Sequence, residues 1–421
     1  MTLPGGLKLA LLPKRNRGET VAVRLQLHWG DATSLLGLSD AGQFATAMID
    51  RGGAGLTRQE IRARFDRLQA RVGFGGGATG VTVSIETVRA HLPETLRLVG
   101  QLLRQPAYPQ SEFNQLKAEM LAGIEESRKD PQSVAVNAIE VHLNHYPKGD
   151  LRYAGTPDED IADIEAVTRD QVASFQQRFF SASHGEVAVI GDFDVDAVQG
   201  AIADGLGKWP ATLPYAPVFE DYLAPRPARL LLETPDKANA FFYARMALPL
   251  RDDDADAPLL TLANYILGEG FLSSRLATRI RQKEGLSYGV GSFLHLNRDT
   301  AASDFGAYAI YAPQNRARLE KAFHEEIDRA LRDGYSDDEV AAARQALLQS
   351  RRLARAQDGG LAGLLAEYLR LGRTMRFSAD SDARIAAATP AELLAALRRH
   401  IDPTQVTAVF AGDFSKTGPT P

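Results

Sequence analysis

Residues 187–193, with the sequence VAVIGDF, recur near the end of the chain as VFAGDF at residues 409–414. Gly191 and Gly412, which occupy the same place in the two copies, are 221 positions apart. Three more pairs of similar segments occur in the same order at spacings of 221 to 227 residues: 9–13 with 230–235, 108–121 with 335–348, and 164–172 with 385–393. A period of this length is too long for a solenoid repeat, so it indicates a duplicated domain.

A proline-rich stretch separates the two copies. Five of the chain's 21 prolines fall between positions 210 and 227. Proline lacks a backbone N–H and favours extended backbone, so such a stretch is typical of a linker. We therefore expect an N-terminal domain at residues 1–208, a linker at 209–228 and a C-terminal domain at 229–421.

Both copies carry signals for helices and for strands. Four Ser/Thr-x-x-Glu/Gln patterns predict helix starts with capping boxes: Thr57 with Glu60, Thr168 with Gln171, Ser336 with Glu339, and Thr389 with Glu392. Apolar residues recur every four positions from Leu319 to Leu331 before Gly334, which predicts an amphipathic helix. Residues 21–27 and 81–88 alternate apolar and polar, as half-buried strands do. The predicted fold class is α+β: two homologous domains, each a mostly antiparallel sheet with helices packed on one face.

The composition excludes several classes of protein. The 421 residues include 48 Lys and Arg against 53 Asp and Glu, a formal net charge of −5, and 44% are hydrophobic. This mix is typical of globular proteins and offers no basic field for nucleic acid. No apolar run approaches the roughly 20 residues that span a bilayer, so we expect no membrane partner. The absence of cysteine excludes disulfides, Cys-ligated zinc and thiol nucleophiles.

The first residues lack the features of a secretory leader. Pro4 and two glycines precede a short apolar stretch, with no basic start and no small-residue cleavage site. Two alternatives stay open: a cytoplasmic protein, or an exported one whose leader is not part of this chain.

Histidine and carboxylate side chains are then the strong ligands left for a metal. No two of the eight histidines stand four positions apart, so neither H-E-x-x-H nor H-x-x-E-H is present. His142 and His145, near Glu140, form the one close pair, and we interpret them as a helix end and a solvated loop. His91 begins half of a zinc motif, but Thr95 stands where the second histidine would be.

A glycine-rich stretch gives a second motif, because Gly75-x-Gly77-x-x-Gly80 formally matches a dinucleotide-binding fingerprint. That fingerprint needs a strand before it and a helix after it. Here the predicted order is reversed, so we expect a flexible turn or a cleft-lining segment. No G-x-S-x-G elbow supports a serine hydrolase.

The most informative stretch for chemistry is residues 268–292, GEGFLSSRLATRIRQKEGLSYGVGS. Glycines open it, and the predicted helix that follows ends at Gly285. That helix carries Arg275, Arg279 and Arg281. A strand that begins near Ser287 then carries Tyr288. The arginines could form a solvated helix face and Tyr288 a core aromatic. Alternatively, Arg281 and Tyr288 converge on a cleft, where a guanidinium and a phenol can hold a peptide backbone and donate to a developing oxyanion.

Residues 273–290, together with the repeat and the Gly-Asp-Phe strand ends, resemble the zinc peptidase family of pitrilysin, insulin-degrading enzyme and the mitochondrial processing peptidases. The resemblance covers nearly the whole chain. It implies an enzyme that closes like a clam around extended peptides, with zinc bound in one half through H-x-x-E-H and a later glutamate. The other half supplies an Arg/Tyr pair spaced R-x₆-Y, which corresponds here to Arg281 and Tyr288.

The chain departs from this family at the metal position. The alignment places residues 43–47, QFATA, on H-x-x-E-H, and places the later glutamate near Gly123. Glu119, Glu125 and Glu126 lie close to that position in sequence. Gln43 is a poor zinc ligand, and Thr46 cannot act as a general base. We therefore expect an inactive zinc site and no cofactor in this chain.

The first hypothesis from the resemblance is a partner subunit of a heteromeric zinc metallopeptidase, inactive on its own. A homologous zinc-bearing chain would pair with it as a heterodimer, with a peptide substrate bound between them. Tyr288 would stabilise the oxyanion and Arg281 would hold the peptide backbone.

Two alternatives belong to other classes. A non-catalytic scaffold or assembly subunit of the same fold would not need the Arg/Tyr pair. A self-sufficient hydrolase would need an unrecognised metal site around His142 and His145. The resemblance favours the periplasm, with the cytoplasm as the alternative.

Overall fold

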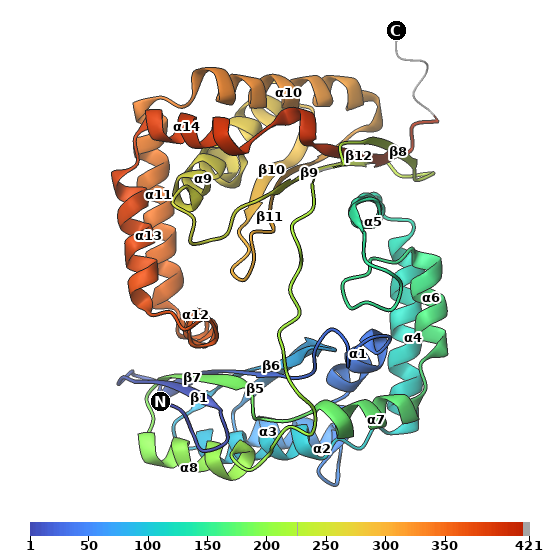
Figure 1. Cartoon of the computed structure of the whole chain (residues 1–421), viewed down its shortest axis with the longest axis vertical. Helices are drawn as coiled ribbons and strands as arrows, with labels where there is room; N and C mark the ends of the chain where they lie inside the picture. The colour runs from blue at the N-terminus through green and yellow to red at the C-terminus, as the bar shows by residue number, and fades with distance from the viewer. Residues whose placement is uncertain (225, 416–421) are drawn as a thin grey trace.

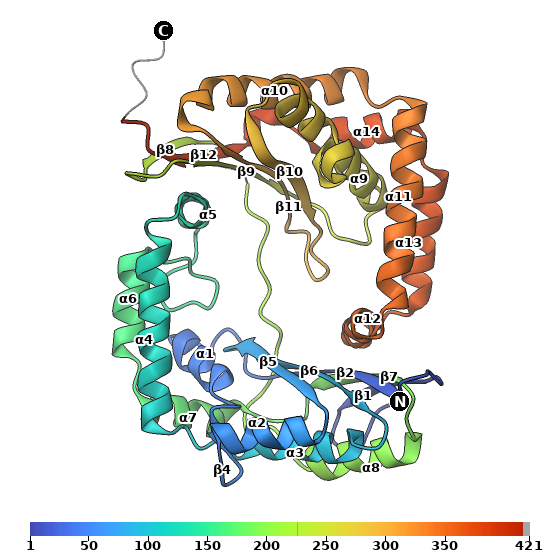
Figure 2. The same cartoon turned by 180° about the vertical axis from the view of Figure 1, so that it is seen from behind.

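The computed structural model describes residues 1–224 and 226–415. The chain forms two layered halves that face each other, each built on a five-stranded sheet (Figure 1). Most helices cover the faces of the sheets that point away from the middle of the molecule (Figures 1 and 2). The predicted α+β fold class, with mostly antiparallel sheets, is confirmed.

The first sheet has the strand order β1-β7-β2-β6-β5. Its strands are β1 (Lys8–Pro13), β2 (Thr20–His28), β5 (Arg71–Gly77), β6 (Gly80–Val88) and β7 (Gly185–Gly191), and a small ribbon adds β3 (Gly52–Gly53) and β4 (Leu56–Thr57). The helices of this half are α1 (Ser39–Ala47), α2 (Arg58–Arg67), α3 (Leu92–Arg104), α4 (Gln110–Ser127), α5 (Pro131–Leu143), α6 (Pro157–Ala166), α7 (Arg169–Phe179) and α8 (Val195–Leu206). β1 runs parallel to β7, and the other neighbours in this sheet are antiparallel.

The second sheet has the order β10-β11-β9-β12-β8. Its strands are β8 (Arg229–Glu233), β9 (Ala240–Leu248), β10 (Ser287–His295), β11 (Ser303–Tyr311) and β12 (Thr407–Gly412). The α-helices are α9 (Ala257–Asn264), α10 (Arg316–Asp333), α11 (Asp337–Ala356), α12 (Asp358–Leu371), α13 (Met375–Ala387) and α14 (Pro390–His400). Short helices are η1 (Tyr265–Glu269), η2 (Phe271–Ser273), η3 (Ala277–Lys283), η4 (Pro313–Asn315) and η5 (Pro403–Gln405), of which η1 and η3 are π-helices. β8 pairs parallel with β12 as β1 does with β7, so the repeated segments form equivalent strands.

Each half has its own large core, but each also sends one helix onto the sheet of the other. On α5, Ala135 and Ile139 pack against Phe241, Val409 and Ala411 of the second sheet. In the other direction, α12 places Ala362 and Ala366 on Ala188 and Ile190 of the first sheet. Figures 1 and 2 both show α5 beside the second sheet and α12 beside the first. This reciprocal exchange ties the halves together.

The described residues between α8 and β8 follow an extended path between the halves (Figure 1). They form no helix or strand. The N–H of Ala216 donates to the carbonyl of Gly30 at 3.0 Å, and the ring of Tyr215 lies 4.7 Å from that of His184. The division into two domains at residues 209–228 stays a prediction.

Most local predictions agree with the structure. All four predicted capping boxes form. Strands β2 and β6 and helix α10 match the predicted segments, and Gly334 follows α10 with φ +69°. The glycine-rich stretch is different, because residues 71–77 form the edge strand β5 rather than a flexible turn. Most residues of this strand are glycine and have no side chain, so the alternation of apolar and polar residues that marks a strand does not appear in its sequence.

Candidate functional site

Arg281 and Tyr288 lie on two elements joined by a tight turn. Arg281 belongs to the π-helix η3, and Tyr288 is the second residue of β10. Between them the chain reverses at Gly285, whose φ of +63° suits glycine. The N–H of Leu286 donates to the carbonyl of Ile280 at 2.9 Å, so the start of β10 lies against the end of η3. The turn therefore brings the two predicted site residues to one end of the second sheet.

The other two arginines of this stretch are held by carboxylates. Arg275 donates to both carboxylate oxygens of Glu339, at 2.7 and 2.8 Å, and to the carbonyl of Gly334 at 2.9 Å. Its guanidinium also lies over the ring of Tyr335, 4.6 Å from the ring centre. These contacts anchor the beginning of the segment to α11.

Arg279 is held in the same way by two carboxylates. Its Nη2 lies 2.7 Å from Glu325 on α10 and 2.9 Å from Glu284 in the turn that follows η3. Within the described part of the chain, the exposed Arg281 has no hydrogen bond or ion pair. The alternative of a solvated arginine face therefore does not hold for Arg275, whose side chain is 12% exposed and paired, whereas Arg281 is exposed to solvent.

Tyr288 is presented by an irregularity in its strand. The pairing of β10 with β11 shifts between Ser287 and Gly289, so Tyr288 is the extra residue of a β-bulge. The hydroxyl of Ser287 stabilises the bulge by donating to the carbonyl of Gly289 at 2.8 Å. Tyr288 is 59% exposed and, among the described residues, its hydroxyl has no partner. The alternative of a core aromatic is wrong, and bulges of this kind commonly aim a side chain at a functional site.

A buried polar network links β10 to α9 and η1. The hydroxyl of Ser292 on β10 donates to the side-chain oxygen of Asn264 at 2.7 Å, and Asn264 donates to Glu269 at 2.9 Å. A Cβ on Gly268 would come within 2.2 Å of the backbone nitrogen of Ser292, so only glycine permits this approach of η1 to β10. Ser292 and Asn264 are both buried. The sequence predicted a helix before Gly285, but it did not indicate that η1 and η3 would be π-helices.

In the first half, the residues aligned with the zinc motif lie on a regular helix and offer no metal ligand. Residues 43–47 lie on α1, where Gln43 and Ala47 are exposed. Thr46 is buried, and its hydroxyl lies 3.1 and 3.0 Å from the carbonyls of Gly42 and Gln43 in its own helix. Protein zinc sites use Cys, His, Asp or Glu, so these residues do not fit zinc.

One of the carboxylates close in sequence to the later ligand position, Glu119, already has a partner. Arg51, just after α1, donates to Glu119 at 2.8 Å. This hydrogen bond, with a second one from Gln115, lowers the pKa of Glu119. The carboxylate of Glu119 therefore already has a guanidinium as its partner.

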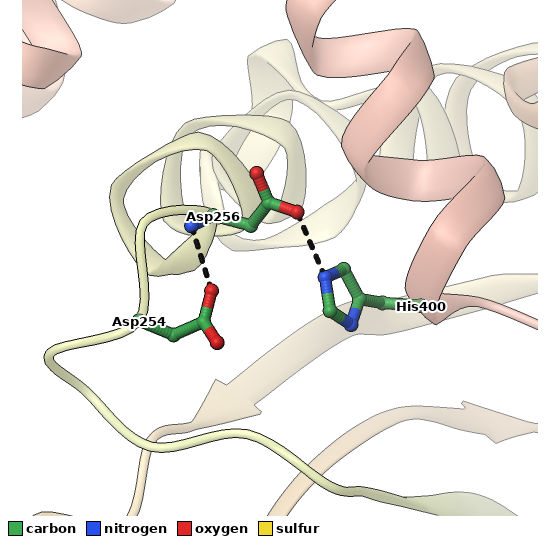
Figure 3. Close-up of side chains that lie close together, drawn as sticks. All are labelled: Asp254, Asp256 and His400. Atoms are coloured by element: carbon green, nitrogen blue, oxygen red, sulfur yellow. Dashed lines mark hydrogen bonds and ion pairs between the residues drawn. The ribbon is translucent and has the colours of Figure 1, made fainter.

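A different group of possible metal ligands lies in the second half, at the junction of α9 and α14. Across residues 1–224 and 226–415, the one group of three or more His, Asp or Glu side chains close enough to share an ion is Asp254, Asp256 and His400 (Figure 3). Arg399 donates to both oxygens of Asp256 at 2.8 Å, and His400 lies 2.9 Å from the same carboxylate. The hydrogen bond from Arg399 lowers the pKa of Asp256. A carboxylate already neutralised by a guanidinium is a poor cation ligand, and the group serves to join two helices.

The histidine pair of the sequence lies at the end of α5 and in the loop that follows it. Helix α5 ends at Leu143, just after His142. The Nε2 of His142 lies 2.8 Å from the carbonyl of Arg226, and the ring of His145 packs on Tyr146, 3.8 Å between centres. These contacts agree with the interpretation as a helix end and loop.

None of the helices in the described ranges is long and apolar enough to cross a bilayer.

Comparison with known proteins supports the resemblance. Residues 166–347 match the model of the peptidase M16 inactive domain. An uncharacterized zinc protease of Streptomyces coelicolor is 25% identical over 94% of this chain and 86% of its own length. A non-peptidase homolog of Helicobacter pylori is 21% identical over 70% of this chain and 66% of its own length.

A solved structure shows the same fold over nearly the whole chain. The crystal structure of a peptidase M16 inactive domain from Pseudomonas fluorescens has a TM-score of 0.83 with 22% identity, and it covers 98% of this chain and 97% of that one. Residues 166–347 are thus similar to the peptidase M16 inactive domain, and over nearly its whole length the chain is similar in sequence to an uncharacterized zinc protease and in fold to an M16 inactive domain.

Proposed function

We propose that this chain is the non-zinc-binding subunit of a heteromeric zinc metallopeptidase and that it supplies Arg281 and Tyr288 to a site completed by a homologous chain. The observation that carries the proposal is the contrast within one segment. Arg275 and Arg279 are tied to carboxylates, whereas Arg281 on the π-helix and Tyr288 at the bulge are exposed and have no partner among the described residues. Both irregularities are common at functional sites.

The chemistry of the pair fits the hydrolysis of a peptide. The phenol of Tyr288 donates a hydrogen bond to the carbonyl oxygen of the scissile bond as negative charge develops there. Arg281 donates to the peptide backbone and adds positive charge near the same oxygen. Both groups act only as hydrogen-bond donors and keep their protons, so neither needs a general base in this chain.

The zinc belongs to the partner in this proposal, because residues 43–47 offer no ligand for it. Bound zinc would supply Lewis-acid chemistry at the scissile bond. The match to an inactive domain supports a chain that depends on another for this chemistry. The periplasm, which the family resemblance favours, is the compartment we propose.

Co-expression tests the proposal. The chain would be produced with a homologue that carries H-x-x-E-H, ideally from a neighbouring gene, and each would also be produced alone. We expect the two chains to co-purify in equal amounts and only the mixture to cleave unstructured peptides. Full peptidase activity of the zinc-bearing chain alone, unchanged by this chain, would overturn the proposal.

The scaffold alternative has one observation in its favour, the relative named a non-peptidase homolog. A scaffold subunit would form the same complex but would tolerate loss of Arg281 and Tyr288. The substitutions described in the Discussion therefore separate the two candidates.

A further inference from the structure

The second sheet ends in a strand whose outer edge has no partner among the described residues. β8 stands last in the strand order and pairs with β12 alone (Figures 1 and 2). Its residues alternate between exposed and half-buried. The strand contains no Lys, no Pro and no bulge, which are the features that commonly protect such an edge from pairing with another chain.

The equivalent edge in the first half is covered by the chain itself. β1 corresponds to β8 in the repeat and also ends its sheet. The N–H of Leu9 donates to the carbonyl of Met1 at 2.7 Å, and the ammonium group of Met1 donates to the carbonyl of Leu9 at 3.0 Å. Within residues 1–224 and 226–415, no segment covers β8 in this way. One edge strand is therefore occupied, whereas the other offers its backbone groups to a second chain.

The free backbone groups of β8 belong to every second residue. At the two ends of the strand, the carbonyl of Ala228 and the N–H of Thr234 bond to β12 at 2.8 and 2.9 Å. Residues that bond to one neighbouring strand alternate with residues that do not. The N–H and carbonyl groups of Arg229, Leu231 and Glu233 therefore point away from β12, to the open edge of the sheet.

The side chains of β8 form a pattern that fits a second copy of itself. Leu230 and Leu232 pack on the inner face with the cluster around α5, so Arg229, Leu231 and Glu233 lie on the opposite face. Antiparallel pairing about a two-fold axis at Leu231 places this leucine opposite its own copy. The same register places Arg229 opposite Glu233 of the second copy. Opposite charges directly across two strands stabilise their pairing.

The groups that this pairing needs are available. Leu231 is 44% exposed. The Nε and Nη2 of Arg229 donate to Glu320 at 2.7 and 2.9 Å, which leaves its Nη1 without a carboxylate in the described structure. Glu233 accepts a hydrogen bond from the N–H of Phe414 at 3.0 Å and has no ion pair among the described residues. In this register, opposed residues with outward backbone groups exchange both of their hydrogen bonds.

We infer that two copies of this chain join through antiparallel pairing of their β8 strands, which merges two five-stranded sheets into one continuous sheet. A two-fold interface presents the same patch on both subunits, so it needs a self-complementary strand such as RLLLE. The inference goes beyond the proposed function and does not depend on it. β10, which carries Tyr288, lies at the opposite edge of the sheet, so the pairing leaves that edge to the zinc-bearing homologue.

The oligomeric state of the isolated full-length chain tests the inference. Analytical ultracentrifugation over a range of protein concentrations measures the dissociation constant of the dimer. Leu231→Pro removes an outward N–H, and edge strands tolerate proline at such positions. Leu231→Lys places two like charges across the axis. The matched control is Leu353→Lys, since Leu353 is 60% exposed on α11.

We expect a monomer–dimer equilibrium for the wild type and for Leu353→Lys. The dissociation constant should be at least about tenfold higher in both Leu231 variants, because hydrogen bonds or the apolar contact at the axis are lost. Circular dichroism must show that these variants remain folded. A wild-type chain that stays monomeric, or a dimer that neither Leu231 substitution weakens, would overturn the inference.

Disulfide trapping tests the register of the pairing. The chain has no cysteine, so Leu231→Cys introduces a single thiol. Opposed residues of a hydrogen-bonded antiparallel pair have Cα atoms about 5.5 Å apart, which suits a disulfide. We expect mild oxidation to link Leu231→Cys into covalent dimers and to leave Leu353→Cys largely monomeric.

Two outcomes of these experiments would contradict the inference. The first is equal cross-linking of Leu231→Cys and Leu353→Cys. The second is a wild-type chain that does not associate with itself but loses the zinc-bearing homologue on Leu231→Pro substitution, because the edge would then bind that partner. Failure to find a zinc-bearing homologue that co-purifies would instead contradict the proposed function alone.

Discussion

The two halves of the molecule share a topology but differ at equivalent places. The offset of 221 residues places residues 43–47 of α1 on residues 264–268, the junction of α9 and η1. In the first half this helix is regular, and Thr46 bonds to its own backbone. In the second half the helix turns into a π-helix, and the buried Asn264 and Ser292 link it to β10. The comparison shows that the second half has buried polar contacts between η1 and β10, the strand that carries Tyr288. At the equivalent place in the first half, Thr46 bonds only within its own helix.

The largest effect is expected from substitutions that remove the exposed groups of Arg281 and Tyr288. In a reconstituted pair, Arg281→Ala or Tyr288→Phe should lower kcat by about 10²–10³, the usual loss for one donor to a developing oxyanion. Steady-state kinetics with an internally quenched peptide would measure this. Gel filtration must show an intact complex, and unchanged kcat in either variant would favour the scaffold alternative.

The next effect concerns the anchor of the same segment. Glu339→Ala removes the close partner of the largely buried guanidinium of Arg275 and leaves only Glu326, 3.8 Å away. Breaking a pair of this kind costs about 3 kcal/mol in the free energy of unfolding. Urea unfolding followed by circular dichroism would show it. Glu325→Ala is a suitable comparison, because Arg279 keeps Glu284 and the loss should be much smaller.

A smaller effect is expected from the buried network. Ser292→Ala removes the hydrogen bond to Asn264 and should lower the free energy of unfolding by about 1 kcal/mol. If the network positions Tyr288, kcat of the complex should fall while KM changes little. Equal kinetics of the Ser292→Ala and wild-type complexes would limit the network to a role in stability.

The ion pair of Glu339 also predicts a dependence on pH. The hydrogen bond from Arg275 lowers the pKa of Glu339 to about 2, below its usual value of 4.5. Because the folded-state pKa is depressed, the stabilisation is complete above pH 4.5 and is lost as the pH falls toward 2. The difference in unfolding midpoint between wild type and Glu339→Gln should therefore be larger at pH 6 than at pH 3. A constant difference would contradict the assignment.

The smallest expected effect lies in the first half. Gln43 occupies the aligned position of the first zinc-binding histidine and is exposed. Gln43→Ala should change neither the activity nor the zinc content of the reconstituted pair. A loss of activity comparable with that of Arg281→Ala would show that α1 contributes to the site after all.

Sequence patterns predicted the regular parts of this fold well, because local chemistry determines them. Thr57 and Ser336 show this at two helix starts, where side-chain and backbone hydrogen bonds are made within four residues. The bulge at Tyr288 had no such signal, since it depends on the register between β10 and β11.

The reciprocal packing of α5 and α12 was likewise hidden in the sequence. Their contact residues, such as Ala135 and Ala362, are small and apolar and do not specify which sheet they meet. The assignment of residues 43–47 to a zinc position came only through the family resemblance, because these residues carry no metal-binding pattern of their own, whereas Arg281 and Tyr288 were already candidates from the expected helix–turn–strand.

The most direct test of the central claim titrates this chain into a fixed amount of the zinc-bearing homologue and measures peptide hydrolysis. The account predicts that wild-type chain raises the rate until the two are equimolar. The double variant R281A/Y288F should bind with the same stoichiometry and give almost no increase. Equal stimulation by the wild type and the double variant would contradict the claim that these two side chains complete the site.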